Sequence, residues 1–503
     1  ATAAAAPHRA APPAVTPDLV ALVTDTTGAP IGDATVLVVE TGRVGTTGRD
    51  GRVILRGLPA GRLHLAVSRT GWAFRRLAVD LPAEGAPVTV AVRLAPAAVL
   101  LPGVQVTAAA SDGDPTRSTQ ATVVLDGRAL QLRQAPSVAQ VLAAEPGMAM
   151  RFNGPIANVP VIRGLTGERI VLLQDGERIG DLAATAVDHL QAVDPALVER
   201  VEVIRGPASL LYGSNAIGGV VNVVGGDLPT SRPTTRSGWI GGQAESVAPG
   251  AVGSAGLTVP LGGGFVATGR GSWRDMRDLR IGGAGRLANT DAVTRGGSAG
   301  LAWFGARGSF GVTARVQDFD YGVPAPDLEA VRIAGDRRAV QLRGELSPQL
   351  GWLPSIRLDA TAQSYAHDEV EPDGVVGTRL ALDTRTVNLA ARTRVGALRG
   401  TVGVQGFFRR YGATGEETFT PAATNDQVAV LLHQELAVGP ARDGDRRASV
   451  QVGARHDVIR IAARPTTDPR FAALETRRFG TTSGSVGLAV PFAHGVSLAT
   501  SVA

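Results

Sequence analysis

Two short stretches of the sequence combine histidine with carboxylate side chains. In AVDHLQAVDP, Asp188 precedes His189, and in QSYAHDEVEPDG, His367 is followed by Asp368 and Glu369. Imidazole nitrogens and carboxylate oxygens suit a borderline divalent ion such as zinc. Adjacent Asp and His residues are also common on solvated turns, and acidic residues are common in loops. The residue types therefore leave two interpretations open, a metal site and an ordinary polar surface.

Other kinds of chemistry find no support in the sequence. The 503 residues include no cysteine, which removes disulfides and thiolate metal sites. The glycine-rich stretch VERVEVIRGPASLLYGSNAIGGVVNVV (198–224) leads into a strand, and the chain has no lysine, so this stretch is not a phosphate-binding loop. Neither a nucleophile elbow nor an HExxH motif occurs. Because these catalytic motifs do not occur, we expect no enzyme. Because the arginines are scattered and pair with nearby acids, we expect no nucleic-acid-binding surface.

The elements around Asp188 and His189 indicate a mixed α+β domain. SVAQVLAAEPG (137–147) has a helical period, with Ser137 as its N-cap. ERIVLLQDGERIG predicts a hairpin that turns at Asp175-Gly176. The glycine-rich stretch predicts a strand, a tight turn, a short helix at 208–212 and a last strand at 220–224.

The region before this domain has a different sequence pattern. Residues 18–94 alternate apolar stretches and turn residues about every ten residues, which predicts a small Ig-like β-sandwich. Residues 1–17 are rich in Ala and Pro, and we expect them to be disordered. The first residues include neither an initiator Met nor the apolar core of a signal peptide, so we expect a mature or trimmed N-terminus.

From residue 236 onward the sequence alternates like long amphipathic strands. In SIRLDATAQ (355–363), Ile356 and Leu358 fall on one face, and Arg357 and Asp359 fall on the other. Charged residues on one face of many strands are expected where that face lines a wet lumen and the apolar face meets lipid. A short turn at 395–400 and long polar stretches at 367–383, 412–426 and 464–480 favour antiparallel transmembrane β-barrel strands. A large soluble β-protein is the alternative.

Several of these motifs resemble one family. The glycine-rich stretch and VIRGLTGERIVLLQDGERIGD resemble the plug domain of TonB-dependent outer-membrane receptors. Residues 18–94 resemble the carboxypeptidase regulatory-like sandwich that precedes the plug in some of them. LLPGVQVTAAA (100–110) resembles the TonB box, which the energising inner-membrane protein captures by strand addition through main-chain groups of Val104, Gln105, Val106 and Thr107. This segment could also be the last strand of the sandwich.

The resemblance implies a domain order. We expect disorder at 1–17, the regulatory-like sandwich at 18–96, the TonB box at 100–107, the plug at 108–226 and the N-terminal portion of a β-barrel at 236–503. The family's barrel has about twenty-two strands, and roughly half of them fit here, so we expect a truncated, incomplete barrel. Arg205 and Glu202 are expected to pair with the inner barrel face. The residues that carry the structural motif of the plug are Arg205, Gly206, Pro207, Tyr212, Gly213, Gly218 and Gly219.

Finer details resemble a zinc-uptake branch of the family. These are the Asp-His pair, RGEL (343–346), YAHDEVEPDGVVGT (365–378) and VGVQGFFRR. The branch implies that Asp188 and His189 hold zinc at the extracellular face with a barrel glutamate, for which Glu369 is the match, and His367 is a further candidate ligand. One departure is YGVPAPDLEAVRI (321–333), which lacks the histidines of the branch's zinc-capturing loop.

The sequence thus predicts a receptor for active uptake of a scarce nutrient, with zinc or a metal chelate as the transported ligand and no cofactor. We expect it in the outer membrane of a Gram-negative bacterium, surrounded by lipid, with its N-terminal domain in the periplasm and a TonB-type protein as partner. A siderophore, haem or cobalamin receptor would share the same plug signature. A surface adhesion protein anchored by a barrel is the alternative of another class, although an anchor needs no plug.

Overall fold

The computed structural model describes residues 17–94, except 70–71, and residues 121–503 with short gaps. The gaps are 184–185, 187, 206–208, 214, 284, 325–329, 416–417, 419, 443–445, 467–468, 472–474 and 493–496. The chain divides into two compact units, residues 1–103 and 104–503. In the described part of the chain, no helix has the length and apolar character needed to cross a membrane.

The first unit is a β-sandwich. One sheet has the strand order β4-β1-β7 and the other has the order β3-β2-β5-β6. The strands are β1 (Leu19–Thr24), β2 (Thr35–Val38), β3 (Arg43–Thr46), β4 (Arg52–Leu55), β5 (Gly61–Arg69), β6 (Trp72–Leu81) and β7 (Val88–Arg93). Alternate apolar side chains such as Val36, Val38, Leu63 and Leu65 point between the sheets and form one buried core.

The second unit begins with the plug, which is built around the mixed sheet β12-β11-β14-β13-β8. Its strands are β8 (Ala121–Asp126), β9 (Met148–Phe152), β10 (Asn158–Ile162), β11 (Ile170–Gln174), β12 (Glu177–Arg178), β13 (Arg200–Arg205) and β14 (Gly219–Val224). Its helices are α1 (Gly127–Gln131), α2 (Val138–Leu142), α3 (Ser209–Tyr212) and the 3-10 turns η2 (Gly167–Arg169) and η3 (Pro195–Leu197). The hairpin β11–β12 turns at Asp175 and Gly176, both with positive φ, as the Asp-Gly pair predicts.

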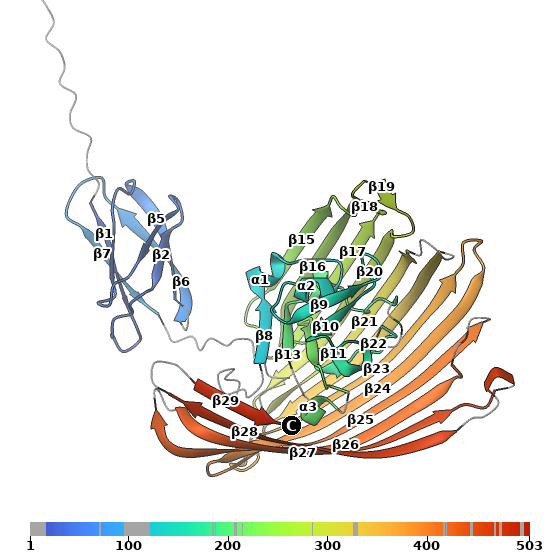
Figure 1. The fold of residues 1–503 in the computed structure, drawn as a ribbon. Coiled ribbons are helices and arrows are strands. Elements are labelled where there is room, and N and C mark those ends of the chain that lie inside the picture. Colours follow the sequence, from blue (N-terminus) through green and yellow to red (C-terminus); the bar gives the residue numbers. More distant parts are fainter. Residues whose placement is uncertain are drawn as a thin grey trace, which may run out of the picture. The chain divides into compact units, whose positions relative to one another are not determined.

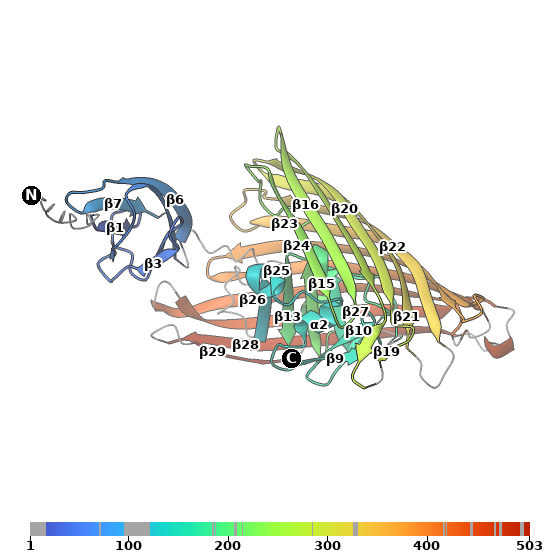
Figure 2. The ribbon, with the colours of Figure 1, turned by 90° about the horizontal axis from the view of Figure 1, so that it is seen from above.

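The plug lies in the concavity of one large antiparallel sheet (Figures 1 and 2). This barrel sheet has 13 strands in the described part of the chain. They are β15 (Ser237–Glu245), β16 (Gly250–Gly262), β17 (Phe265–Met276), β20 (Ala292–Gly305), β21 (Gly308–Val323), β22 (Val331–Leu346), β23 (Ser355–Val370), β24 (Val376–Val395), β25 (Leu398–Gly415), β26 (Ala423–Arg442), β27 (Arg446–Ala463), β28 (Thr476–Pro491) and β29 (Ser497–Val502). Two short strands, β18 (Leu279–Ile281) and β19 (Gly285–Leu287), pair with each other, and a 3-10 turn, η4 (Pro469–Phe471), precedes β28.

The two faces of each barrel strand differ as the alternation predicts. On β23, Leu358 is 43 % exposed on the outer face, whereas Asp359 is 7 % exposed on the inner face, where it accepts from Arg343 and Arg357. The inward polar side chains bond to the plug: Gln363 accepts a hydrogen bond from the Gly180 N–H and donates one to the Arg178 carbonyl. The predicted mainly β fold, with sandwich, plug and antiparallel barrel sheet, is therefore confirmed.

Several local expectations are wrong. The helix expected at 137–147 covers only α2, although Ser137 caps it by accepting from the Gln140 N–H. The loops expected at 367–383, 412–426 and 464–480 are shorter, because the flanking strands continue into them. Glu202 was expected to pair with the barrel, but it pairs within the plug sheet, with Arg200 at 2.6 Å and with the Asn222 side-chain amide, from which it accepts, at 2.9 Å. Arg205 donates to the carbonyl of Pro146 inside the plug. Both side chains thus bond to groups of the plug.

Candidate metal centre

The plug half of the candidate site lies on the segment between β12 and η3. Asp181 holds the ends of this segment together, because its two carboxylate oxygens accept from the backbone N–H groups of Ala183 (3.2 Å) and Ala192 (3.0 Å). His189 lies within the segment and is only 3 % exposed. The segment therefore presents a buried imidazole toward the barrel wall.

The barrel half of the site comes from the end of β23. Alternate residues of a strand face the same side, so His367 and Glu369 point inward together. His367 is 2 % exposed, and the Glu369 side chain is 21 % exposed. Both lie beside an apolar cluster that includes Leu190 of the plug and Phe319, Tyr321 and Tyr365 of the barrel.

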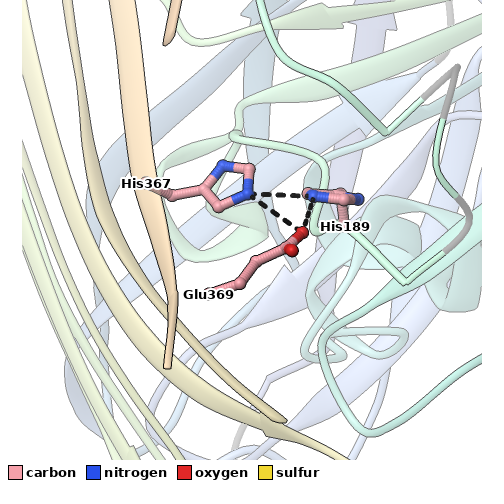
Figure 3. Close-up of side chains that lie close together, drawn as sticks. All are labelled: His189, His367 and Glu369. Carbon is pink, nitrogen blue, oxygen red and sulfur yellow. Dashed lines mark hydrogen bonds and ion pairs between the residues drawn. The ribbon is translucent and has the colours of Figure 1, made fainter. Parts of the chain in front are cut away.

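Three ligand-type atoms from the two halves form a small triangle (Figure 3). The Nε2 atoms of His189 and His367 are 3.0 Å apart. Oε1 of Glu369 lies 3.4 Å from Nε2 of His189 and 3.7 Å from Nε2 of His367. A tetrahedral zinc ion with bonds of about 2.0–2.1 Å separates its ligands by about 3.3 Å. The edges of the triangle scatter around that value, so the three atoms fit one face of a zinc tetrahedron.

Asp188 has a different position from the other three predicted residues. Its Oδ1 lies 3.1 Å from Nδ1 of His189, the ring nitrogen outside the triangle, which is an ion-pair contact without the geometry of a hydrogen bond. A carboxylate on the second nitrogen of a metal-binding histidine fixes the ring's orientation and makes the ligand nitrogen more basic. In this geometry Asp188 supports His189 and does not reach the triangle itself. Nδ1 of His367 has no hydrogen-bond partner in the described part of the chain.

Charge around His189 favours a cation. Burial opposes protonation of the ring, but the carboxylates of Asp188 and Glu369 outweigh burial and raise the pKa of His189 to about 9. The contact with His189 in turn lowers the pKa of Asp188. At neutral pH without metal, His189 therefore carries a proton that faces Glu369 and His367. A divalent ion in the triangle would displace that proton and bind the Glu369 carboxylate, while Asp188 stays on the far ring nitrogen of His189.

Six of the other predicted residues lie in parts of the chain that the structure does not describe. Val104, Gln105, Val106 and Thr107 of the TonB-box candidate lie outside the described residues, and so do Gly206 and Pro207.

The remaining glycines of the plug motif lie in closely packed places that leave no room for a side chain. Gly219 has φ +147°, and a Cβ there would lie 2.2 Å from the Ile204 carbonyl oxygen. A Cβ on Gly213 would meet the Arg178 guanidinium, and one on Gly218 would meet Leu165. Tyr212 ends α3, and its carbonyl accepts from Arg178 at 2.8 Å. These residues build the plug rather than a binding site.

Sequence reasoning missed a contact that ties the backbone beside His189 to the barrel. The Tyr321 hydroxyl on β21 accepts from the Leu190 N–H at 2.9 Å and lies 3.1 Å from the Asp188 carbonyl, to which it donates. The chain has only four tyrosines, and Tyr321 is in phase with inward-facing Phe319. The rarity of tyrosine in the chain and the inward phase of Tyr321 on its strand are the two sequence features that could have indicated this contact.

Comparison with known proteins identifies the two N-terminal parts of the chain. Residues 114–220 match the TonB-dependent Receptor Plug Domain, and residues 19–95 match the Carboxypeptidase regulatory-like domain. A hemin receptor of Yersinia pestis is 36 % identical over 119 residues, which are 23 % of this chain and 17 % of that receptor.

Solved structures extend the similarity to the barrel sheet. The copper transporter OprC superposes with a TM-score of 0.63 at 16 % identity, over 76 % of this chain and 62 % of that one. The iron transporter FrpB of Neisseria meningitidis gives 0.60 at 14 % identity, over 76 % and 64 % of the two chains. The hemophore receptor HasR of Serratia marcescens, solved with its hemophore HasA and heme, gives 0.60 at 15 % identity, over 75 % and 61 %.

The chain thus spans about six tenths of the length of these solved proteins. They are receptors and transporters, which are not enzymes, and receptors of this kind carry no resident cofactor. The plug match and the shared barrel architecture agree with the order of elements along this chain. Residues 114–220 therefore match the plug domain of TonB-dependent receptors, and the plug and barrel sheet of this chain share the fold of the corresponding part of these solved receptors and transporters.

Proposed function

We propose that this protein is an outer-membrane receptor that binds a borderline divalent metal ion, zinc in the first place, for uptake into the periplasm. The observation that carries the proposal is the triangle of His189, His367 and Glu369, with edges of 3.0, 3.4 and 3.7 Å. Two imidazoles and one carboxylate are a ligand set that zinc prefers, and a fourth position stays available for water or another oxygen ligand.

The dimensions of the triangle favour a bare ion over a metal complex. Both histidines are almost fully buried, and their Nε2 atoms are 3.0 Å apart. That spacing admits a single ion but no flat macrocycle between the two rings, which argues against haem held by both histidines. A siderophore or cobalamin would need a broad open surface, whereas this ligand set is compact. Copper(II) also binds imidazole and carboxylate, so it is the competitor to test.

The division of the ligands between plug and barrel suggests how the ion would be released. His189 belongs to the plug, whereas His367 and Glu369 belong to one barrel strand. Any movement of the plug segment away from β23 removes one of three ligands, so the affinity falls when the plug moves. In this proposal a TonB-type protein captures residues 104–107 by strand addition and supplies the pull. The N-terminal sandwich then lies in the periplasm.

An adhesion protein anchored by a barrel is the competing function. Inward polar residues of the barrel strands bond to the plug, as Arg337 does to the Ala192 carbonyl at 2.8 Å. A passive anchor gains nothing from a plug inside the barrel sheet, or from a metal-ligand set that is divided between plug and barrel. Metal uptake accounts for both features.

Growth under metal limitation tests the proposal. Cells that lack the receptor are supplied with the full-length gene, with its His189→Ala variant or with a deletion of residues 100–107. The medium contains limiting zinc, copper, ferric chelate, haem or cobalamin. We expect rescue on zinc by the parent gene alone, with zinc binding retained after the deletion. Rescue on haem or cobalamin only, or equal rescue by His189→Ala, would refute the metal-ion proposal.

A further inference from the structure

Tyr321 connects the barrel wall to the backbone on both sides of His189. The residue lies on the inner face of β21 and is 1 % exposed. Its hydroxyl accepts from the Leu190 N–H at 2.9 Å and donates to the Asp188 carbonyl at 3.1 Å. One barrel side chain therefore holds both peptide groups that flank the histidine.

Among the residues that the structure describes, the ion pairs and hydrogen bonds of the His189 ring are all with groups of the site itself. Its ring contacts are Asp188 on one nitrogen and Glu369 and His367 on the other. The position of Nε2 in the metal-free protein therefore depends on the backbone that carries the ring. Among the described residues, the Tyr321 hydroxyl makes the hydrogen bonds that fix this backbone relative to the barrel at Asp188 and Leu190.

We propose that Tyr321 is a positioning residue for the metal site, which sets the distance between the plug ligand His189 and the barrel ligands His367 and Glu369. This inference rests on the proposed function. Metal affinity is sensitive to such supporting contacts, since removing an outer partner of a ligand typically weakens binding about 10–100-fold. Without the hydroxyl, the Leu190 N–H and the Asp188 carbonyl lose their partner in a buried place, and His189 is free to drift from the triangle.

The chain offers a matched control in Tyr365. This residue lies on β23, is also 1 % exposed, belongs to the same apolar cluster and stacks on Phe319 with ring centroids 5.7 Å apart. Its hydroxyl has no hydrogen-bond partner among the described residues. Tyr321→Phe and Tyr365→Phe are thus the same chemical change in the same surroundings, and only the first removes bonds to the plug segment.

The experiment compares the full chain, Tyr321→Phe and Tyr365→Phe in detergent, with ZnCl2 and CoCl2 as probes. Zinc affinity is measured by competition with a chromophoric chelator, and the geometry of bound Co²⁺ by its visible absorption. We expect about tenfold weaker zinc binding and an altered cobalt spectrum for Tyr321→Phe, and parent-like values for Tyr365→Phe. In a His189→Ala background, Tyr321→Phe should have no further effect, because it acts through that histidine.

The outcomes separate this inference from the proposed function. If the parent protein binds no zinc at all, the proposed function is refuted. If the parent binds zinc and Tyr321→Phe binds it equally well with an unchanged cobalt spectrum, the positioning role is refuted. The positioning role is also refuted if Tyr321→Phe fails to fold while Tyr365→Phe folds. It is refuted as well if Tyr321→Phe still weakens zinc binding in the His189→Ala background, since the hydroxyl would then serve the fold alone.

Discussion

Replacing His189 with alanine removes one of the three ligand atoms and leaves the barrel strand intact. Structural zinc sites bind with about 10–16 kcal/mol through four ligands, which corresponds to about 3 kcal/mol per ligand. We therefore expect His189→Ala to weaken zinc binding by about two orders of magnitude. Asp188→Ala removes only the support of Nδ1, and the Asp188 side chain is 44 % exposed. We expect Asp188→Ala to weaken zinc binding by about tenfold, which is the lower end of the loss seen when the outer partner of a metal ligand is removed.

Zinc titration calorimetry in detergent measures this series, with His456→Ala as the control. His456 is an exposed histidine of β27 whose Nδ1 lies 2.9 Å from the Thr482 hydroxyl oxygen. The control should bind zinc as the parent does. Equal affinities for parent, His189→Ala and Asp188→Ala would refute the site. A larger loss for Asp188→Ala than for His189→Ala would contradict the assignment of Asp188 as a supporting residue.

The remaining predictions concern pH, the interface between plug and barrel, and the backbone. Zinc affinity should rise about tenfold per pH unit between pH 6 and 7.5, because zinc displaces the proton that His189 holds below its pKa of about 9. A zinc affinity that does not change with pH in the same titration would contradict this. Arg315→Ala should cost about 3–5 kcal/mol in denaturant unfolding, because it leaves buried Asp175 without its ion-pair partner and leaves buried Asp227 with Arg270 alone. Exposed Arg338→Ala should cost under about 0.5 kcal/mol, and equal losses for the two variants would contradict a stabilising role of the Arg315 ion pairs. Gly219→Ala should prevent stable plug folding, as seen by proteolysis, because its Cβ would overlap a carbonyl, and Gly253→Ala, with open space around it, should not.

Much of the fold follows from local pattern. The alternation in SIRLDATAQ predicts which side chains of β23 meet the plug, and the Asp-Gly pair predicts the turn of the β11–β12 hairpin. Both depend on residues that are neighbours in sequence, so no distant contact is needed to infer them. Strand ends are less predictable, because polar residues near the rim continue the pairing when a neighbouring strand offers it.

The candidate site was predictable in composition but not in assembly. His189 and His367 are 178 positions apart, and only the docking of the plug in the barrel brings their rings together. The separate role of Asp188 depends on which ring nitrogen faces the barrel, and sequence carries no information on that. Tyr321 contributes through bonds to backbone groups, which leave no signature in the residue types of the plug segment.

The central claim is that plug and barrel together hold one divalent ion, and anomalous diffraction at the zinc edge tests it most directly. Crystals of the full chain grown with one equivalent of zinc should give a single strong anomalous peak within about 2.3 Å of Nε2 of His189, Nε2 of His367 and a carboxylate oxygen of Glu369. The peak should be absent from His189→Ala crystals grown in the same way. A zinc peak elsewhere, or no peak between the plug and β23, would contradict the account.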